Sequence, residues 1–223
     1  MKRLDTILSL LSPGCRLADI GCDHAYIPVA AVSSGAASFA YASDVREGPL
    51  SRARENAEKA GLSDRIVLDL ADGLENAEKY APDTVVIAGM GGELIAGIID
   101  KADFVKKGGV RLILQPMTCP EKLRRYLLSA GFAITAERLA KEDRRIYQII
   151  VCEYTGEAGN YTETELLAGK NTEDKELLPA LYRKYINKYE KIIKGKAASG
   201  VDHSFEDRIS GELKEKYENN RAL

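Results

Sequence analysis

Four aspartates follow apolar segments of the chain, at positions from which they could hold a cationic ligand. Asp19 and Asp23 lie in one loop, Asp44 comes 25 residues after Asp19, and Asp72 follows a third apolar segment. If these segments are parallel strands, their carboxyl ends share the sheet edge at which doubly wound folds bind ligands. The pattern therefore predicts that the four carboxylates surround one ligand. The plainer alternative is that each aspartate only caps a loop.

Two classes of cofactor compete for the turn at Gly21. A dinucleotide places its pyrophosphate on a helix N-terminus beside G-x-G-x-x-G, but only Gly21 of that pattern is present, and Asp19 and Asp23 would repel a phosphate. S-adenosylmethionine carries a sulfonium and an ammonium and no phosphate, so acidic surroundings favour it. We expect Asp44 to accept hydrogen bonds from both ribose hydroxyls and Asp72 to accept one from the adenine amino group.

The same loop carries Asp23, His24 and Tyr26, and each has two interpretations. Asp23 and His24 are the candidate catalytic residues, facing the sulfonium, the methionine moiety or the target base. Alternatively, Asp23 caps the turn and His24 makes a structural hydrogen bond. Tyr26 either stacks on a flipped adenine or begins a buried helix as a core residue. Pro28 suits the first turn of that helix.

The string Gly89-Met-Gly-Gly92 follows the fourth apolar segment. Enzymes that methylate an exocyclic adenine nitrogen generally carry a (D/N)PP(Y/F) motif here, and this chain lacks it. A glycine-rich turn lets the backbone approach a flat target closely. It suits a ring nitrogen with an in-plane lone pair, which needs no strong base. The alternative is a tight turn before the helix at Leu94.

The segments that position these residues alternate between strand and helix. Helical patterns span Gly48–Ala60, Leu94–Lys101 and Pro120–Ala130. Short apolar strands separated by such helices predict an α/β fold with a parallel sheet covered on both faces. The last two strands have no helix between them, so they form an antiparallel hairpin, as in the seven-stranded Rossmann-like sheet of class I methyltransferases. The predicted strands are Arg16–Ile20, Phe39–Ser43, Ile66–Asp69, Thr84–Ala88, Arg111–Gln115, Ala133–Leu139 and Tyr147–Cys152.

Both ends of the chain have helical patterns. The first residues form an amphipathic helix rather than a signal peptide, with Leu4, Ile7, Leu8 and Leu11 on one face. The character changes near residue 156, which divides a catalytic domain, 1–155, from a C-terminal domain, 156–223. After a linker, 156–160, one long helical segment runs to about Gly195, and a final helix follows a turn. Apolar stripes on both, with Phe205 on the last helix, predict an α-helical hairpin.

Composition excludes several classes of protein. The 223 residues are 45% hydrophobic and 30% charged, which excludes disorder as the main state. No apolar run approaches the roughly 18 residues of a membrane span, so we expect no membrane partner. The four cysteines are dispersed and there are two histidines, so no zinc or other metal is expected. Dispersed thiols without a secretion signal predict a cytoplasmic location.

Basic residues gather in two places although the net charge is −2. Phosphate contacts from such clusters would position an RNA without reading its sequence; the alternative is a solvated helix face. One cluster frames the end of the catalytic domain and the other lies on the long helix. Their members are Arg124, Arg125, Arg138, Lys141, Arg144 and Arg145, and then Arg183, Lys184, Lys188, Lys191, Lys194 and Lys196.

Three strings, in this order, resemble the bacterial tRNA adenine-22 N1-methyltransferases: Asp19-Ile-Gly-Cys-Asp-His-Ala-Tyr-Ile-Pro28, Ile87-Ala-Gly-Met-Gly-Gly92 and Leu112-Ile-Leu-Gln-Pro116. The resemblance covers the whole chain. It implies a Rossmann-like catalytic domain, an α-helical extension, S-adenosylmethionine as methyl donor and tRNA as acceptor.

The chain departs from the family pattern at three positions. Cys22 replaces the usual serine, and Asp44 stands where several relatives have glutamate. Met117 stands where asparagine usually follows Gln115-Pro116, which removes a polar contact near the target base.

The reaction implied is in-line transfer of the methyl group to N1 of an unpaired or flipped adenine at position 22 of tRNA. Two alternatives stay open: a methyltransferase that acts on a small molecule or a protein, and a non-catalytic RNA-binding protein with this fold. The oligomeric state, monomer or weak dimer, also stays open. The resemblance implies that Arg3 contacts the carboxylate of the cofactor. The expected cofactor residues are Arg3, Asp19, Gly21, Asp23, His24, Asp44, Val45, Asp72, Gly73, Ala88 and Gly89. The expected substrate residues are Tyr26, Met90, Gly91, Gly92, Gln115, Pro116, Lys188, Lys191 and Lys194.

Overall fold

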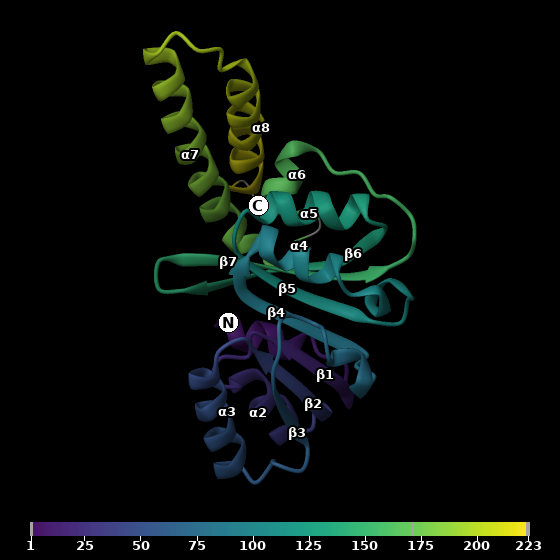
Figure 1. Cartoon of the computed structure of the whole chain (residues 1–223). Helices are drawn as coiled ribbons and strands as arrows, with labels where there is room; N and C mark the ends of the chain where they lie inside the picture. Colours follow the sequence, from purple (N-terminus) through teal and green to yellow (C-terminus); the bar gives the residue numbers. More distant parts are fainter. Residues whose placement is uncertain (1, 171, 222–223) are drawn as a thin grey trace.

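A seven-stranded sheet forms the centre of the molecule in the computed structural model, which describes residues 2–170 and 172–221 (Figure 1). The strand order is β3-β2-β1-β4-β5-β7-β6. All neighbours are parallel except β7, which runs antiparallel to both β5 and β6. The predicted α/β methyltransferase sheet is thus confirmed. The strands are β1 (Cys15–Ile20), β2 (Ala37–Asp44), β3 (Ile66–Leu70), β4 (Thr84–Gly91), β5 (Arg111–Thr118), β6 (Phe132–Glu142) and β7 (Arg145–Tyr154).

Helices cover both faces of the sheet, because its central strands are apolar on both sides. One face packs against α4 (Gly92–Asp100), the 3-10 turn η2 (Asp103–Lys106) and α5 (Pro120–Ser129). The other packs against α1 (Arg3–Ser9), α2 (Tyr26–Ser33) and α3 (Glu47–Lys59). A short 3-10 turn, η1 (Ala77–Tyr80), precedes β4. The chain leaves β1 towards β2 and β3 and returns to β4 on the other side of β1. That reversal places a switch point, where such sheets bind ligands, at the carboxyl ends of β1 and β4.

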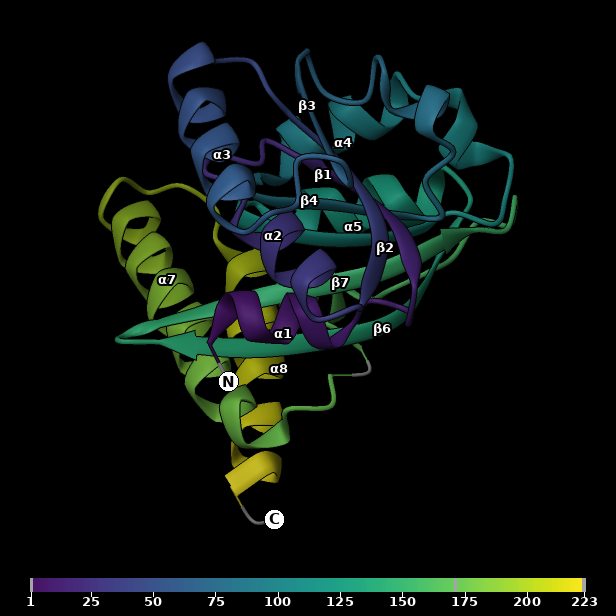
Figure 2. The same ribbon diagram turned by 90° about the horizontal axis from the view of Figure 1, so that it is seen from below.

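The last two strands extend well beyond the ends predicted from the sequence. Pairing continues to Glu142 opposite Arg145, with a two-residue turn in which Asp143 has a φ of +51°. The charged stretch around this turn has the composition of a loop. It forms strand because the end of the hairpin leaves the sheet as a two-stranded ribbon (Figures 1 and 2), in which Lys141, Asp143, Arg144 and Arg145 are exposed.

The C-terminal region differs from the prediction of one long helical segment, which is wrong before residue 178. A short helix α6 (Glu163–Ala168) begins at a capping box made by Thr162 and Glu165 and ends at Gly169, whose φ is +89°. The chain then lies against β6 and passes through a 3-10 turn, η3 (Lys175–Leu177). Hydrogen bonds from Arg138 and from the backbone N–H of Leu139 to Asp174 hold it there.

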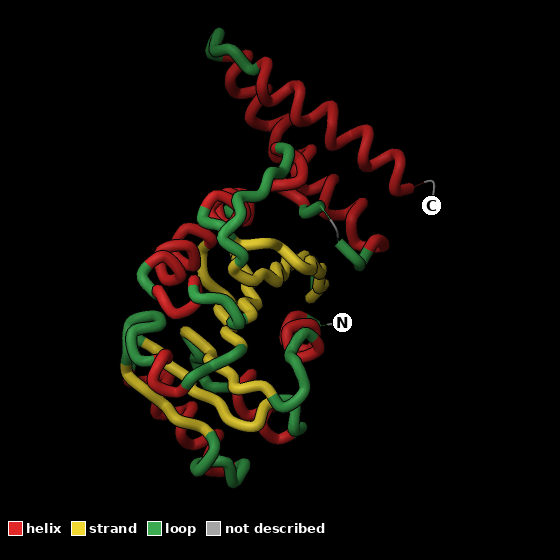
Figure 3. Tube along the Cα trace, turned by 90° about the vertical axis from the view of Figure 1, so that its right-hand side faces the viewer, coloured by secondary structure: helices red, strands yellow, loops and turns green. Residues whose placement is uncertain are grey.

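The predicted helical hairpin is confirmed. It consists of α7 (Leu178–Ala198) and α8 (Ser204–Arg221), which lie side by side and project from the sheet (Figure 3). Leu181, Ile209 and Leu213 form its buried seam, as the stripes predict. The prediction for Phe205 is wrong, because its side chain is 46% exposed and lies against Arg208 instead. The proposed division of the chain at residue 155 stays a prediction.

Arg124 is buried, so its assignment to an RNA-binding cluster is wrong. Its guanidinium donates to Glu137 Oε1 at 2.7 Å, to the Leu166 carbonyl at 2.9 Å and to Gln148 Oε1 at 2.9 Å. The Gln148 amide in turn donates to the Tyr185 hydroxyl at 2.9 Å. This buried polar network joins α5, β6, β7, α6 and α7. Two further members of the cluster, Arg138 and Arg125, are engaged with Asp174 and Glu163.

No helix in the described ranges is long and apolar enough to cross a membrane. Within the same ranges, no three histidine, cysteine or acidic side chains are grouped so that they could hold a metal ion.

Candidate active site

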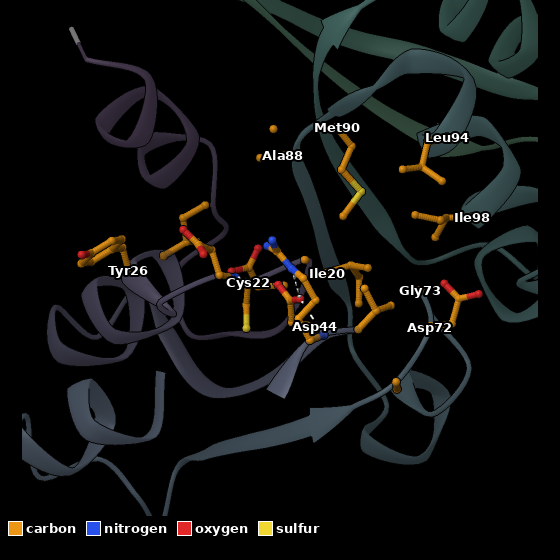
Figure 4. A pocket seen from close by; sticks show the side chains of 18 of the residues that line it. Ile20, Cys22, Tyr26, Asp44, Asp72, Gly73, Ala88, Met90, Leu94 and Ile98 are labelled. Carbon is orange, nitrogen blue, oxygen red and sulfur yellow. Dashed lines mark hydrogen bonds and ion pairs between the residues drawn. The ribbon is translucent and has the colours of Figure 1, made fainter. Parts of the chain in front are cut away.

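A cavity of about 650 Å³ opens at the carboxyl ends of β1, β2 and β4, at the switch point of the sheet. In Figure 4, Tyr26 lies at one end of this cofactor cavity and Leu94, Ile98 and Asp72 at the other, with Asp44 between them. The structure brings together most of the residues predicted for the cofactor. Those that line it are Arg3, Asp19, Gly21, Asp23, Asp44, Val45, Asp72, Gly73, Ala88 and Gly89, with Tyr26 and Met90 from the predicted substrate set.

Two carboxylates are buried in the wall of the cavity. Asp19 is 3% exposed and Asp44 is 5% exposed, and the strands that carry them are neighbours. Burial, with the negative charge of Asp44 as a second cause, raises the pKa of Asp19 from its ordinary 3.8 to about 7. A carboxylate is stable in so dry a place only when a cation or donors compensate it. The cavity therefore favours a ligand with positive charge next to Asp19.

Asp44 is held in place by its own neighbours. One oxygen accepts from the backbone N–H of Asp23 at 3.2 Å, and the other accepts from the backbone N–H of Arg46 at 3.0 Å. The Arg46 guanidinium also reaches it, at 3.5 Å. These bonds tie the end of β2 to the loop after β1. A carboxylate fixed in this way has lone pairs left to accept further hydrogen bonds; the prediction that it accepts them from the ribose hydroxyls stays a prediction.

The loop after β1 has an uncommon backbone. Asp23 and Ala25 both have left-handed φ values, +50° and +56°, although neither is glycine. Gly21, between β1 and this loop, has a φ of +70°, and a Cβ there would come 2.1 Å from the end of the Met90 side chain. Positive φ at ordinary residues costs of order 1 kcal/mol or more each, and such strain clusters at functional sites.

Asp23, His24 and Tyr26 form a cluster at the cavity mouth. His24 Nδ1 lies 3.2 Å from the Tyr26 hydroxyl, and His24 Nε2 lies 3.7 Å from Asp23 Oδ1. Tyr26 is 57% exposed, so the alternative of a core residue is wrong for it. Asp23 and Tyr26 line the cavity, whereas the His24 ring touches it only through them.

Arg3 closes the cavity on the side of α1. Its guanidinium donates to Gln115 Oε1 at 3.0 Å and lies over the ring of Tyr147, 5.5 Å from the ring centre. Its backbone N–H donates to Glu142 at 2.8 Å. The buried Nε has no hydrogen-bond partner among the described residues. An unused donor in the cavity wall fits a carboxylate of a bound ligand.

The residues of the glycine-rich string, 89–92, have two different structural roles. Gly89, with a φ of +84°, and Met90 line the cavity. Gly92 begins α4, and a Cβ there would come 2.4 Å from the carbonyl oxygen of Cys119. The structural alternative, a tight turn before the helix, therefore accounts for Gly92. Gly91 lies in the strand end beside Thr118, and Gln115 is fully buried beneath Arg3.

A second cavity, of about 890 Å³, lies between the end of β5, the tip of the β6–β7 ribbon and α7. Pro116, Met117 and Lys188 from the sequence analysis line it. Gln115 donates its amide to the Met117 sulfur at 3.6 Å. Lys191 and Lys194 are exposed further along α7, outside this cavity.

Sequence reasoning included Val45 but missed Leu94 and Ile98 in the apolar part of the cofactor cavity. Leu94, at 57% exposure, joins Val45, at 62%, and Ile98 at its rim. Isolated apolar residues on helices carry no signature that separates a ligand contact from core packing. Exposed apolar side chains beside Asp72 suit a flat ring with one polar edge.

The donor set fits S-adenosylmethionine. It offers buried acids for a cation, a fixed carboxylate for ribose hydroxyls, an exposed Asp72 beside apolar side chains for adenine, and the Arg3 donor for a carboxylate. A pyrophosphate would meet Asp19, Asp23 and Asp44 with like charge.

Comparisons with known proteins agree with this geometry. A family model described as a methyltransferase domain matches residues 1–150. A curated protein from Bacillus subtilis (strain 168), named tRNA (adenine(22)-N(1))-methyltransferase, is 38% identical over 168 residues, which cover 75% of this chain and 71% of that protein.

Solved structures resemble the whole chain. The crystal structure of the B. subtilis M1A22 tRNA methyltransferase TrmK is 30% identical with a TM-score of 0.78, covering 99% of this chain and 97% of its own. A Streptococcus pneumoniae relative in complex with S-adenosyl-L-methionine is 33% identical with a TM-score of 0.82, covering 96% of this chain and 99% of its own.

Proposed function

The chain belongs to the family of tRNA (adenine(22)-N(1))-methyltransferases, and on this basis we propose that it methylates N1 of adenine 22 in tRNA with S-adenosylmethionine. The observation that carries the proposal is the cavity at the switch point, where buried Asp19 and Asp44 suit a cation without phosphate. When bound, the cofactor supplies a methyl group made electrophilic by its positive sulfur.

Each part of the cavity holds one part of this cofactor. Asp19 compensates its positive charge, Asp44 accepts from the ribose hydroxyls, and Asp72 accepts from the adenine amino group between Val45, Leu94 and Ile98. The remaining predicted cofactor residues, Gly21, Gly73, Ala88 and Gly89, supply small backbone walls, and Arg3 pairs with the carboxylate.

Little proton transfer is needed for the chemistry. Adenine N1 has an in-plane lone pair, so it attacks the methyl carbon directly, and the carbon–sulfur bond breaks with its electron pair moving to sulfur. The protein contributes mainly by alignment, which is worth several kcal/mol. As the attack proceeds, the adenine ring becomes positively charged, and the Asp23 carboxylate at the cavity mouth stabilises that charge. His24 acts by holding Tyr26 and Asp23 rather than as a base.

The target base must leave its stack, since N1 lies on the pairing edge. Tyr26, exposed at the cavity mouth, is placed to stack on the extruded ring. Of the other residues predicted for the substrate, Met90 lines the same cavity and Pro116 lines the second cavity, whereas Gln115 is buried beneath Arg3 and Gly91 and Gly92 join β4 to α4. Lys188, Lys191 and Lys194 on α7 contact the tRNA phosphates. Because tRNA is the substrate, we place the protein in the cytoplasm.

The test uses unmodified tRNA transcripts that differ only by A or G at position 22, with methyl-labelled S-adenosylmethionine. After nuclease digestion, mass spectrometry identifies the methylated nucleoside. We expect N1-methyladenosine from the A22 transcript alone. Transfer to neither transcript with cofactor binding intact would instead favour a methyltransferase of other specificity. Loss of cofactor binding as well would favour a non-catalytic RNA-binding protein.

A further inference from the structure

The second cavity, here called the ribbon–hairpin groove, shares a wall with the cofactor cavity. It runs from Met117 between the tip of the β6–β7 ribbon and α7, and Figure 2 shows the ribbon passing beside α7. Arg3 lines the cofactor cavity, and Tyr147, whose ring lies beneath the Arg3 guanidinium, lines the groove. A strand lying in the groove would therefore continue past this wall to the mouth of the cofactor cavity.

The groove carries a concentrated positive charge. Its lining holds five cationic side chains and two carboxylates, those of Glu121 and Asp143. The five cations belong to two elements far apart in sequence. They are Lys141, Arg144 and Arg145 on the ribbon and Lys184 and Lys188 on α7.

These cations are available to a ligand. All five are exposed, and among the described residues none of them has an acidic partner within ion-pair distance. Partial burial and repulsion from the nearby charge of Lys188 lower the pKa of Lys184. An anion between the ribbon and α7 would relieve this repulsion.

The buried polar network holds part of the lining of the groove in place. Its floor contains Gln148 and Tyr185, which are joined by the 2.9 Å hydrogen bond of the buried polar network. Through Gln148 that network reaches Arg124, so α7 is fixed against β7 and α5. An anion-binding site whose walls are already in place loses less entropy on binding than one whose walls must first assemble.

We propose that the ribbon–hairpin groove binds the phosphodiester backbone of the tRNA strand next to the methyl-accepting nucleotide. The inference rests on the proposed function and deepens it. It assigns Lys141, Arg144 and Arg145 to the tRNA, together with Lys184 and Lys188, and it makes the groove the element that aligns the target with the cofactor cavity. Phosphate contacts fix register without reading bases, so the groove positions the strand and Tyr26 receives the base.

A thiol footprint tests occupancy of the groove in the wild-type protein. Cys119 lines the groove and is partly exposed, while Cys15, Cys22 and Cys152 are buried. Iodoacetamide should label Cys119 first, and mass spectrometry gives its rate. We expect saturating A22 tRNA to slow this labelling at least tenfold and S-adenosylhomocysteine alone to leave it within twofold.

A pair of variants that each lose three positive charges tests which cations bind the tRNA. The ribbon variant carries Lys141→Ala, Arg144→Ala and Arg145→Ala. The control variant removes three exposed charges from α3 with Arg52→Ala, Arg54→Ala and Lys59→Ala. We expect the ribbon variant alone to lose tRNA affinity tenfold or more at moderate salt and to lower the slope of log affinity against log salt by about 2, since each phosphate contact contributes roughly 0.7–0.9. Calorimetry should give both variants wild-type affinity for the cofactor.

The outcomes distinguish failure of the groove proposal from failure of the proposed function. Methylation of adenine 22 with unchanged Cys119 labelling, or equal loss of affinity in both variants, would overturn the groove and leave the function standing. Protection of Cys119 by inorganic phosphate as complete as that by tRNA would make it a small-anion site instead. Absence of both tRNA binding and methyl transfer would overturn function and groove together.

Discussion

Replacing Asp19 by asparagine should stabilise the protein without cofactor while removing most of its affinity for the cofactor. The folded state raises the pKa of Asp19 from 3.8 to about 7, so the folded protein binds this proton more tightly than the unfolded chain does. Above pH 7 both states are ionised and the folded state carries the full cost of the buried charge. Three pKa units at about 1.4 kcal/mol each put that cost near 4 kcal/mol. Asparagine is neutral at every pH and avoids it.

The assay is urea unfolding of both proteins without cofactor at pH 8 and pH 5. We expect the free energy of unfolding of Asp19→Asn to exceed that of the wild type by up to about 4 kcal/mol at pH 8. At pH 5 the folded wild type is already protonated, so the difference should fall below half of that value. Below pH 3.8 it should disappear.

Calorimetry with the cofactor completes the test, because a bound cation favours the ionised carboxylate. Wild-type affinity should fall by up to tenfold per pH unit below about pH 7, and Asp19→Asn should bind weakly at every pH. A variant no more stable than the wild type at pH 8, or one with nearly wild-type cofactor affinity, would refute the reasoning.

Three further substitutions probe other parts of the site. Arg3→Ala should raise the cofactor dissociation constant roughly thirtyfold, the effect of about 2 kcal/mol from a lost charge-assisted hydrogen bond; calorimetry showing no change would remove Arg3 from the cofactor. Arg124→Met should lower the free energy of unfolding by about 3–5 kcal/mol because the buried Glu137 carboxylate loses its guanidinium partner, whereas Arg125→Met on the exposed side of α5 should change it by less than about 0.5 kcal/mol in the same denaturation experiment. Tyr26→Ala should reduce kcat/KM for tRNA by roughly tenfold or more, from lost stacking of about 1–3 kcal/mol, with the cofactor dissociation constant changed less than threefold; equal loss of both would place Tyr26 on the cofactor instead.

The sheet and its acids could be predicted because each depends on local pattern. Apolar runs of strand length separated by helices predict a parallel sheet, and Asp19 and Asp44, each at or near the end of such a run, then fall at one edge of it. The same reasoning failed for Arg124, since its burial depends on Glu137, Gln148 and Leu166, which reach it only in the folded chain. The sequence does not show whether a charged side chain will be buried next to a partner in the fold.

The ribbon–hairpin groove illustrates the other limit. Its two walls, the ribbon tip and α7, are separated by a short helix, a 3-10 turn and a segment lying against β6. The sequence analysis placed Lys141, Arg144 and Arg145 in one cluster with Arg124 and Arg138, because a sequence shows only which residues are close along the chain. The fold instead groups them with Lys184 and Lys188.

The buried polar network has a consequence for how the chain is made. Arg124 leaves the ribosome well before Tyr185, which completes the network through Gln148. Until α6 has emerged, the Arg124 guanidinium lacks the Leu166 carbonyl, and until α7 has emerged, the Gln148 amide lacks the Tyr185 hydroxyl, so water takes these places in a nascent chain. The edge of the sheet formed by β7 and β6 therefore reaches its final packing only after the helix that forms one wall of the groove has been synthesised. Premature termination near residue 155 would leave a fragment with an open, polar edge, a substrate for proteases and chaperones rather than a working half-enzyme.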